Sequence, residues 1–236
     1  MNKNILAVIR SELTNQSDPA VRDGAKRYFK EDIRVYGLKN AAVSRLAAGY
    51  FKEVKPLGKS QIFALCEELF RSGFMEESFI ACEWTYRVRK EYIPEDFAIF
   101  EKWVGKYVSN WATCDTLCNH TIGTFVEMYP GYVQNLRVWA KSPNRWLRRA
   151  AAVTLIVPAK NGKFLEDVFK IADILLTDKD DLVQKGYGWM LKAASQAHRK
   201  EVFEYVQGHK AVMPRTALRY AIEKMPAEMK SLAMAK

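Results

Sequence analysis

A spaced repeat constrains the fold of this chain more than any other feature of its sequence. Similar segments start at residues 76, 111, 146 and 182, so their offsets are 35, 35 and 36 residues, and a further candidate starts at 214. They read EESFIACEWTYRV, WATCDTLCNHTIG, WLRRAAAVTLIVP, LVQKGYGWMLKAA and PRTALRYAIEKM. Such a period is typical of stacked helical pairs, each of which buries its apolar face only against its neighbours.

Helical patterns continue through most of the chain, whereas strand signals are scarce. Residues 60–73 place four apolar side chains on one helical face, namely Ile62, Leu65, Cys66 and Phe70. The sequence therefore predicts an all-α fold, a HEAT-like or armadillo-type helical repeat solenoid (an α-α superhelix). No linker rich in Pro, Gly or Ser divides the chain. We expect a single domain over residues 1–236, with about six helical pairs and a basic concave face as the binding surface.

Positive charge is concentrated in the C-terminal part of the chain. Residues 137–236 carry 19 Lys and Arg against 10 Asp and Glu, whereas residues 1–136 carry 18 against 17. This asymmetry favours an anionic partner, of which nucleic acid is the commonest. No apolar stretch is long enough to span a membrane and no secretory signal is visible. We therefore expect no membrane partner, a cytoplasmic location and reduced cysteines.

Several kinds of chemistry find no support in the sequence. The two thiols of CDTLC, residues 114–118, have no matching Cys or His set for a zinc site, and the three histidines are isolated. No phosphate-binding loop, dinucleotide-binding loop or nucleophile elbow occurs. The sequence therefore predicts neither a nucleotide hydrolase, a zinc deaminase nor a serine hydrolase, and it implies no metal and no cofactor.

One acidic residue interrupts an otherwise apolar helical face, which consists of Trp111, Cys114, Asp115, Cys118, Ile122 and Phe125. A carboxylate in such a place is costly unless it is paired, hydrogen-bonded or open to a cleft. Asp115 is therefore either a structural residue bonded to a neighbouring helix or the acid of a functional site beside Trp111.

A second tryptophan lies among cations. Trp189 has Lys185 four residues before it and Lys192 three residues after it. The lysine stems either pack on the indole, or ring and ammonium groups together meet a nucleic acid.

Three arginines follow a predicted helix start at Ser142 or Asn144. Arg145, Arg148 and Arg149 oppose the helix dipole there, by about 0.3–1 kcal/mol per charge. They favour a bound anion, slightly, over the alternative that one or more of them pairs with a carboxylate such as Asp115. Tyr28 also lies among basic residues, in AKRYFKED, where rim packing is its usual role.

Four segments together resemble the AlkD-like family of DNA alkylation repair enzymes: RYFK (27–30), NWATCD (110–115), NRWLRRAA (144–151) and QKGYGWMLKA (184–193). These are bacterial DNA glycosylases built from HEAT-like repeats. The resemblance, which extends from Tyr28 to the C-terminal helices, implies base excision repair. It implies hydrolysis of the N-glycosidic bond of cationic N3- or N7-alkylated purines, 3-methyladenine and 7-methylguanine, in double-stranded DNA. It also implies a monomer in a bacterial cytoplasm, and the lack of a His or Lys nucleophile argues for a monofunctional enzyme.

The resemblance also assigns roles to residues. It implies that Asp115, Trp111 and Trp189 surround the deoxyribose of the lesion as catalytic residues. It implies DNA contacts by Tyr28 and Arg149, to which the basic neighbourhood adds Arg148, Lys185 and Lys192. The chain departs from the family pattern in having Ala112 after Trp111 and a second arginine, Arg148, before Arg149.

Two other functions are compatible with the same residues. One is a non-catalytic HEAT-repeat protein that binds branched or distorted DNA by shape. The other is a protein-interaction solenoid in which Trp111 and Trp189 are partner hot spots. Only the DNA readings predict binding that weakens steeply with salt.

Overall fold

The computed structural model describes the backbone of residues 2–235 and confirms the all-α prediction. Within that range the ordered elements are all helical, and the one extended pairing is an isolated bridge between Arg34 and Phe74. The chain divides into two compact units, an N-terminal unit (Met1–Thr116) and a C-terminal unit (Leu117–Lys236). The single domain over residues 1–236 with a basic concave face stays a prediction.

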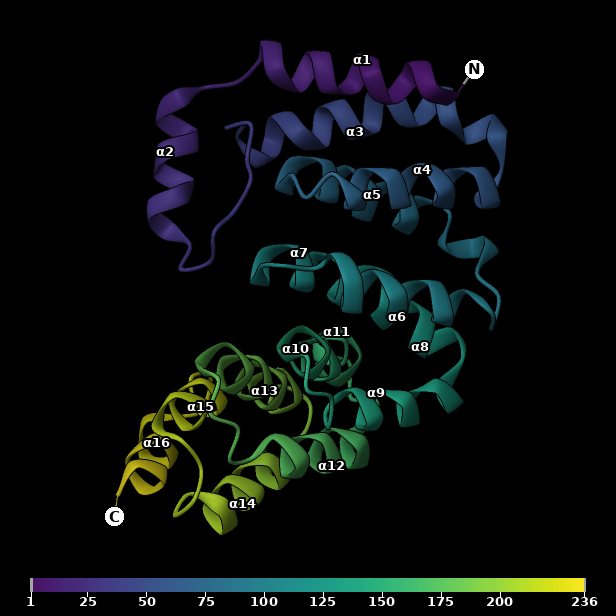
Figure 1. Ribbon diagram of the computed structural model, residues 1–236. Helices are drawn as coiled ribbons and strands as arrows, with labels where there is room; N and C mark the ends of the chain where they lie inside the picture. Colours follow the sequence, from purple (N-terminus) through teal and green to yellow (C-terminus); the bar gives the residue numbers. More distant parts are fainter. Residues whose placement is uncertain (1, 236) are drawn as a thin grey trace. The chain divides into compact units, whose positions relative to one another are not determined.

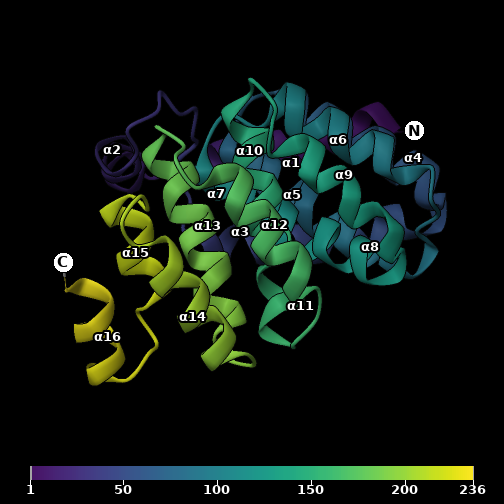
Figure 2. The ribbon, with the colours of Figure 1, turned by 90° about the horizontal axis from the view of Figure 1, so that it is seen from below.

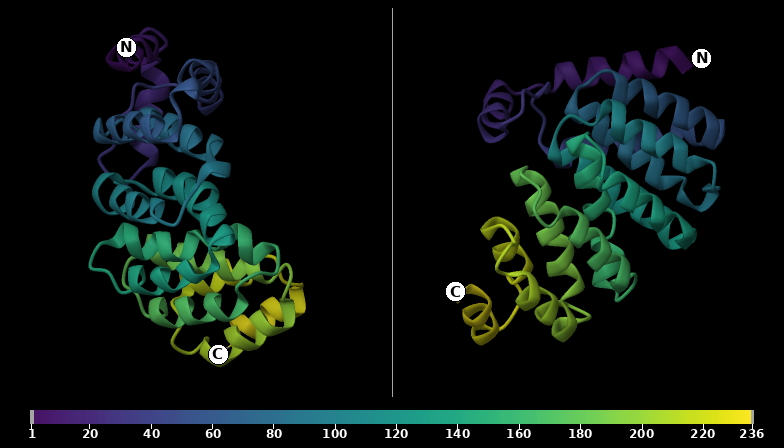
Figure 3. Two further views of the ribbon diagram at one scale, coloured as in Figure 1. Left: turned by 90° about the vertical axis from the view of Figure 1, so that its right-hand side faces the viewer. Right: turned by 60° about the horizontal axis from the view of Figure 1, so that its bottom comes forward.

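The N-terminal unit contains seven α-helices in the described part of the chain (Figure 1). They are α1 (Asn2–Asn15), α2 (Pro19–Tyr28), α3 (Asn40–Val54), α4 (Lys59–Arg71), α5 (Met75–Arg87), α6 (Asp96–Tyr107) and α7 (Trp111–Thr116), with 3₁₀ turns at Lys55–Leu57 and Arg89–Glu91. Helix α5 packs against α3, α4 and α7, and Figure 3 shows α3, α4 and α5 side by side. The predicted apolar face of residues 60–73 is buried in α4, as expected.

Two buried carboxylates at the start of α5 fix the loop between α2 and α3. Glu76 accepts hydrogen bonds from the backbone N–H groups of Tyr36, Gly37 and Leu38, at 2.8–3.2 Å. Glu77 accepts from the guanidinium of Arg10 and from the Tyr36 hydroxyl. Both carboxylates therefore have partners for their buried oxygens, as burial of a charge requires.

Helix α2 is the exception in this unit, because none of its residues is buried. Asp18 caps its start, with Oδ1 accepting from the N–H of Ala20 at 2.8 Å. The Asp18 N–H in turn donates to the carbonyl of Gly37. Gly37 has a φ of +105°, and a Cβ there would lie 2.5 Å from the Asp18 carbonyl oxygen, so this close approach requires glycine.

The C-terminal unit begins with a π-helix, Leu117–Ile122, and a 3₁₀ turn at Pro130–Tyr132 follows. Its α-helices are α8 (Gly123–Met128), α9 (Val133–Trp139), α10 (Arg145–Val153), α11 (Ile156–Lys160), α12 (Leu165–Leu175), α13 (Asp181–Ala194), α14 (Arg199–His209), α15 (Arg215–Ala221) and α16 (Ala227–Met234). Helix α13 packs between α10 and α15, an order that can be followed in Figure 2. The close approach of α15 depends on Gly188, where a Cβ would lie 2.7 Å from the Ala217 carbonyl oxygen.

The repeat period correctly located one helix of each repeat. The segments predicted at 76, 111, 146, 182 and 214 each start within one residue of a helix, at Met75, Trp111, Arg145, Asp181 and Arg215. This agreement follows from the need of each helix to present its apolar residues to the neighbouring repeat.

Candidate functional site

The predicted site residues fall in both units. The N-terminal unit holds Tyr28, Trp111 and Asp115, and the C-terminal unit holds Arg148, Arg149, Lys185, Trp189 and Lys192. Within the N-terminal unit, Tyr28 and Trp111 are in contact.

Helix α7 places Trp111 and Asp115 one turn apart. The side chain of Asn110 accepts a hydrogen bond from the N–H of Thr113 at 2.9 Å, so it caps the start of α7 with Trp111 in the first turn. Trp111 is half-buried, and Asp115 is only 8% exposed. A carboxylate therefore lies close beneath the surface of the N-terminal unit, one turn beyond an accessible indole.

The apolar face predicted beyond Asp115 does not continue with α-helical spacing, which corrects that part of the prediction. The π-helix Leu117–Ile122 follows α7 directly and shifts the later residues relative to an α-helix. Its residues include Asn, His, Thr and Ile, which are weak helix formers. Cys118, Ile122 and Phe125 are nevertheless buried, as predicted.

Three rings form an aromatic cluster in the N-terminal unit: Tyr28, Phe29 and Trp111. Tyr28 and Trp111 meet with their centroids 6.0 Å apart and their planes at 67°. Phe29 stacks on Trp111, with centroids 5.0 Å apart and planes at 14°. Tyr28 is 73% exposed, so it lies at the rim of this cluster with most of its surface open to solvent. Phe29 was missed in the sequence, although it is the apolar residue of RYFK.

The lysines beside Trp189 both have carboxylate partners. Lys185 pairs with Asp181 of the same helix at 3.1 Å. Lys192 pairs with Glu223 at 2.9 Å and lies over the ring of Tyr220. The hydrogen bond from Lys192 lowers the pKa of Glu223, which keeps the pair charged at neutral pH. Trp189 itself is half-buried, at the edge of the apolar face, as its flanking lysines predicted.

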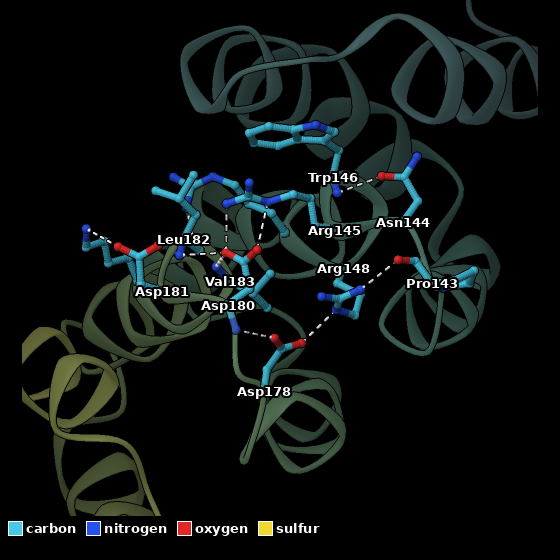
Figure 4. Close-up of polar contacts among 12 residues, drawn as sticks. Pro143, Asn144, Arg145, Trp146, Arg148, Asp178, Asp180, Asp181, Leu182 and Val183 are labelled. Atoms are coloured by element: carbon cyan, nitrogen blue, oxygen red, sulfur yellow. Dashed lines mark hydrogen bonds and ion pairs between the residues drawn. The ribbon is translucent and has the colours of Figure 1, made fainter. Parts of the chain in front are cut away.

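The arginines at the start of α10 meet carboxylates from the start of α13 (Figure 4). Arg145 makes a two-point contact with Asp180, at 2.7 and 3.0 Å. Arg148 Nε lies 2.7 Å from Asp178, and its Nη1 donates to the carbonyl of Ser142. Carboxylate pairing is therefore confirmed for Arg145 and Arg148, with Asp180 and Asp178 as the partners, and binding of an anion by the three arginines stays a prediction. The physical reason is that α10 and α13 pack side by side, so the acidic start of one reaches the basic start of the other.

Arg149 differs from its two neighbours because it is only 5% exposed. Its Nη1 donates to the carbonyl of Leu182 on α13. It lies against Gly186 of α13, where a Cβ would be in ordinary van der Waals contact with Arg149 Cγ, at 3.5 Å. Arg149 therefore lies in the packed surface between α10 and α13.

Asp180, besides its ion pair, provides the start of α13. Asp180 caps α13 by accepting from the N–H of Leu182 at 2.9 Å, and Asn144 caps α10 in the same way through Trp146. The repeat period itself is a signal for the ion pair. Arg145 and Asp180 are 35 residues apart, which is one repeat, so they occupy equivalent ends of neighbouring helices.

Two further findings concern the described residues as a whole. All four cysteines are buried and none forms a disulfide, and burial raises the pKa of the Cys66 thiol to about 12. Between residues 2 and 235, no three His, Cys, Asp or Glu side chains are grouped so that they could hold a metal ion. In the same range, no helix has both the length and the apolar composition of a membrane span.

Comparison with known proteins finds a matching family model and similar solved structures. The model of the family described as DNA alkylation repair enzyme matches residues 9–225. A solved structure described as a predicted DNA alkylation repair enzyme from Enterococcus faecalis is similar, with a TM-score of 0.81 at 18% sequence identity, over 90% of this chain and 98% of that one. At this identity the likeness is evidence of a shared fold. A search of curated proteins found no match.

Proposed function

Because this chain belongs to the DNA alkylation repair enzyme family, we propose that it is a DNA glycosylase that removes N3- and N7-alkylated purines from duplex DNA. Family membership supports a role in alkylation repair with DNA as the partner. The observation that carries the finer proposal is the pair on α7, a nearly buried carboxylate, Asp115, one turn beyond the half-buried Trp111.

The chemistry of the lesion fits these residues. An N3- or N7-alkylated purine is already cationic, so it leaves with the bonding electrons and becomes neutral without a general acid. The transition state instead places positive charge on the deoxyribose. A carboxylate stabilises such a cation, as it does in glycoside hydrolysis. Asp115 would fill this role, and would accept a proton from the water that attacks C1′.

The tryptophans would act through their faces. An indole face attracts a cation by up to ~2 kcal/mol when water is excluded. Trp111 and Trp189 are both half-buried, so part of each ring is accessible to a sugar. Neither residue forms a covalent bond in this scheme, which is that of a monofunctional glycosylase acting by direct hydrolysis.

The proposed DNA contacts differ in what they require. Tyr28 is exposed and can reach a phosphate directly. Lys185, Lys192 and Arg148 each hold a carboxylate, so each would exchange that partner for a phosphate when DNA binds. Arg149 would act through a small exposed part of its guanidinium. We also propose that the protein acts as a monomer in a bacterial cytoplasm and uses neither metal nor cofactor.

The decisive measurement is release of 7-methylguanine from methylated duplex DNA by the wild type and by Asp115→Asn. We expect the substitution to slow release by about 10²–10³-fold, because it removes the charge that opposes the sugar cation. Asp96→Asn is the matched control. Asp96 is also a buried carboxylate of the N-terminal unit, paired with Lys59 at 2.7 Å, so its loss should lower stability and leave release intact.

Other outcomes would identify other functions. A folded wild type that binds DNA and releases no base would indicate a non-catalytic binder of branched or distorted DNA. Release at the wild-type rate by Asp115→Asn would make Asp115 a structural residue. A partner whose binding is insensitive to salt would point to the protein-interaction solenoid.

A further inference from the structure

The aromatic cluster contains a ring without an assigned role. Phe29 ends α2, with its N–H donating to the carbonyl of Ala25 and its own backbone extended, at φ −84° and ψ 142°. This change from helical to extended backbone takes the side chain off the helix axis. Its ring lies nearly parallel to the indole of Trp111, 5.0 Å between centroids.

The rest of α2 does not explain why Phe29 lies there. The helix buries none of its residues, so packing along its length does not hold it. Its start is tied through Asp18 to Gly37, in the loop that Glu76 fixes. At its other end, the rings of Tyr28 and Phe29 contact each other and the ring of Trp111.

We propose that Phe29 is the positioning residue of Trp111. An indole has two faces, and the stacked Phe29 covers one of them, so the other face is the one presented to a ligand. Tyr28, edge-on to both rings, limits rotation of the indole about its long axis. The orientation matters because attraction of a cation requires the charge to lie over the ring face.

This inference rests on the proposed function, since the ligand in question is the cationic sugar of the lesion. It adds a residue that touches no reacting atom in the scheme above. Phe29 acts only through Trp111, so its effect should vanish when Trp111 is absent.

The test uses single-turnover release of 7-methylguanine with the whole protein in excess over methylated duplex DNA. Phe29→Leu keeps an apolar side chain and loses the ring. We expect it to slow release by about fivefold, in line with the usual strength of an aromatic pair, while DNA affinity stays at the wild-type value. Phe29→Tyr keeps a stacked ring and should restore the wild-type rate. In a Trp111→Ala background, Phe29→Leu should cause no further loss.

A second stacked pair of the same unit supplies the matched control. Phe74 is also half-buried and stacks on Tyr36, with centroids 4.2 Å apart and planes at 24°. This pair is separate from the aromatic cluster of Tyr28, Phe29 and Trp111. Phe74→Leu should therefore lower stability by a similar amount without slowing release. The signal of the Trp111 indole N–H, assigned with Trp111→Phe in ¹⁵N-tryptophan-labelled protein, should shift in Phe29→Leu and stay in place in Phe74→Leu.

The outcomes separate the two proposals. A wild type that releases no base refutes the glycosylase, and the role of Phe29 falls with it. An active wild type whose rate or Trp111 signal is unchanged by Phe29→Leu refutes the positioning role alone. Equal slowing by Phe29→Leu and Phe74→Leu also refutes it, because a general loss of stability would then explain both.

Discussion

The two tryptophans of the proposed site are held by different physical means. Trp111 starts a helix of six residues, and its ring is fixed by side chains from α2, a helix that buries nothing of its own. Trp189 lies inside a helix of 14 residues that packs between two others, with its neighbour Gly188 in backbone contact with α15. The orientation of Trp111 thus depends on a few side chains, whereas that of Trp189 depends on the packing of whole helices. Substitutions that disturb one should leave the other in place.

Among the substitutions that test this comparison of the two tryptophans, the largest effect is expected when each indole is removed. Trp111→Ala and Trp189→Ala should each slow release of 7-methylguanine by about 30-fold, since a desolvated cation–π contact contributes up to ~2 kcal/mol and 1.4 kcal/mol is a factor of ten. Trp→Phe at either position should give an intermediate rate, because phenyl is the weaker cation binder. If Trp189→Ala retained the wild-type rate, the aromatic wall would consist of Trp111 alone.

The next largest effect is expected from a substitution beside Trp189 that disturbs the packing of α13. Gly188→Ala places a Cβ 2.7 Å from the Ala217 carbonyl oxygen and from Tyr220 Cβ, so α13 and α15 must move apart. Overpacking of this kind costs about 1–3 kcal/mol, which urea unfolding would measure.

Gly24→Ala is the matched substitution on the Trp111 side of the comparison. Gly24 lies inside α2, and a Cβ there meets nothing within 4 Å. Alanine should therefore stabilise α2 by up to ~1 kcal/mol through helix propensity and leave release unchanged. Equal destabilisation by both substitutions would show that contact with α15 is not what makes Gly188 necessary.

The same contrast explains what could be predicted from the sequence. Helix starts followed from the repeat period, because each repeat must bury its apolar face against the next. The proximity of Tyr28 to Trp111 was implied only by the family resemblance, and nothing in local spacing predicts it. The stacking of Phe29 on Trp111 joins residues 82 positions apart, and the ion pair of Arg148 with Asp178 joins residues 30 positions apart. Neither contact can be predicted from the local sequence. The π-helix Leu117–Ile122 was not predicted, because its residues fit an α-helical pattern as well as a π-helical one.

A smaller effect concerns the charge around Trp189. Glu223→Gln would release Lys192 from its carboxylate and leave an ammonium group free for a phosphate. We expect tighter binding to duplex DNA by a few-fold, because an exposed ion pair is worth up to ~1 kcal/mol. Glu228→Gln, at the start of α16, changes the net charge equally. Within the described part of the chain Glu228 forms no ion pair with a lysine, so it controls for general charge. Equal gains from both would mean that Lys192 does not contact DNA.

The smallest effect is the pH dependence of that same ion pair. Hydrogen bonding from Lys192 lowers the pKa of Glu223 in the folded protein, whereas the unfolded chain has the ordinary value of about 4.3. The pair therefore stabilises the fold fully above that value, and its contribution is lost as the pH falls through the lower, folded pKa. The carboxylate is 50% exposed, so the contribution is small and weakens with salt.

The measurement is urea unfolding of the wild type and Glu223→Gln between pH 7 and pH 3. The wild type should be slightly more stable at pH 7, and the difference should shrink as the pH falls below about 4.3. A difference that stayed constant down to pH 3 would show that Glu223 stabilises the fold by packing, and that Lys192 is not restrained by its charge.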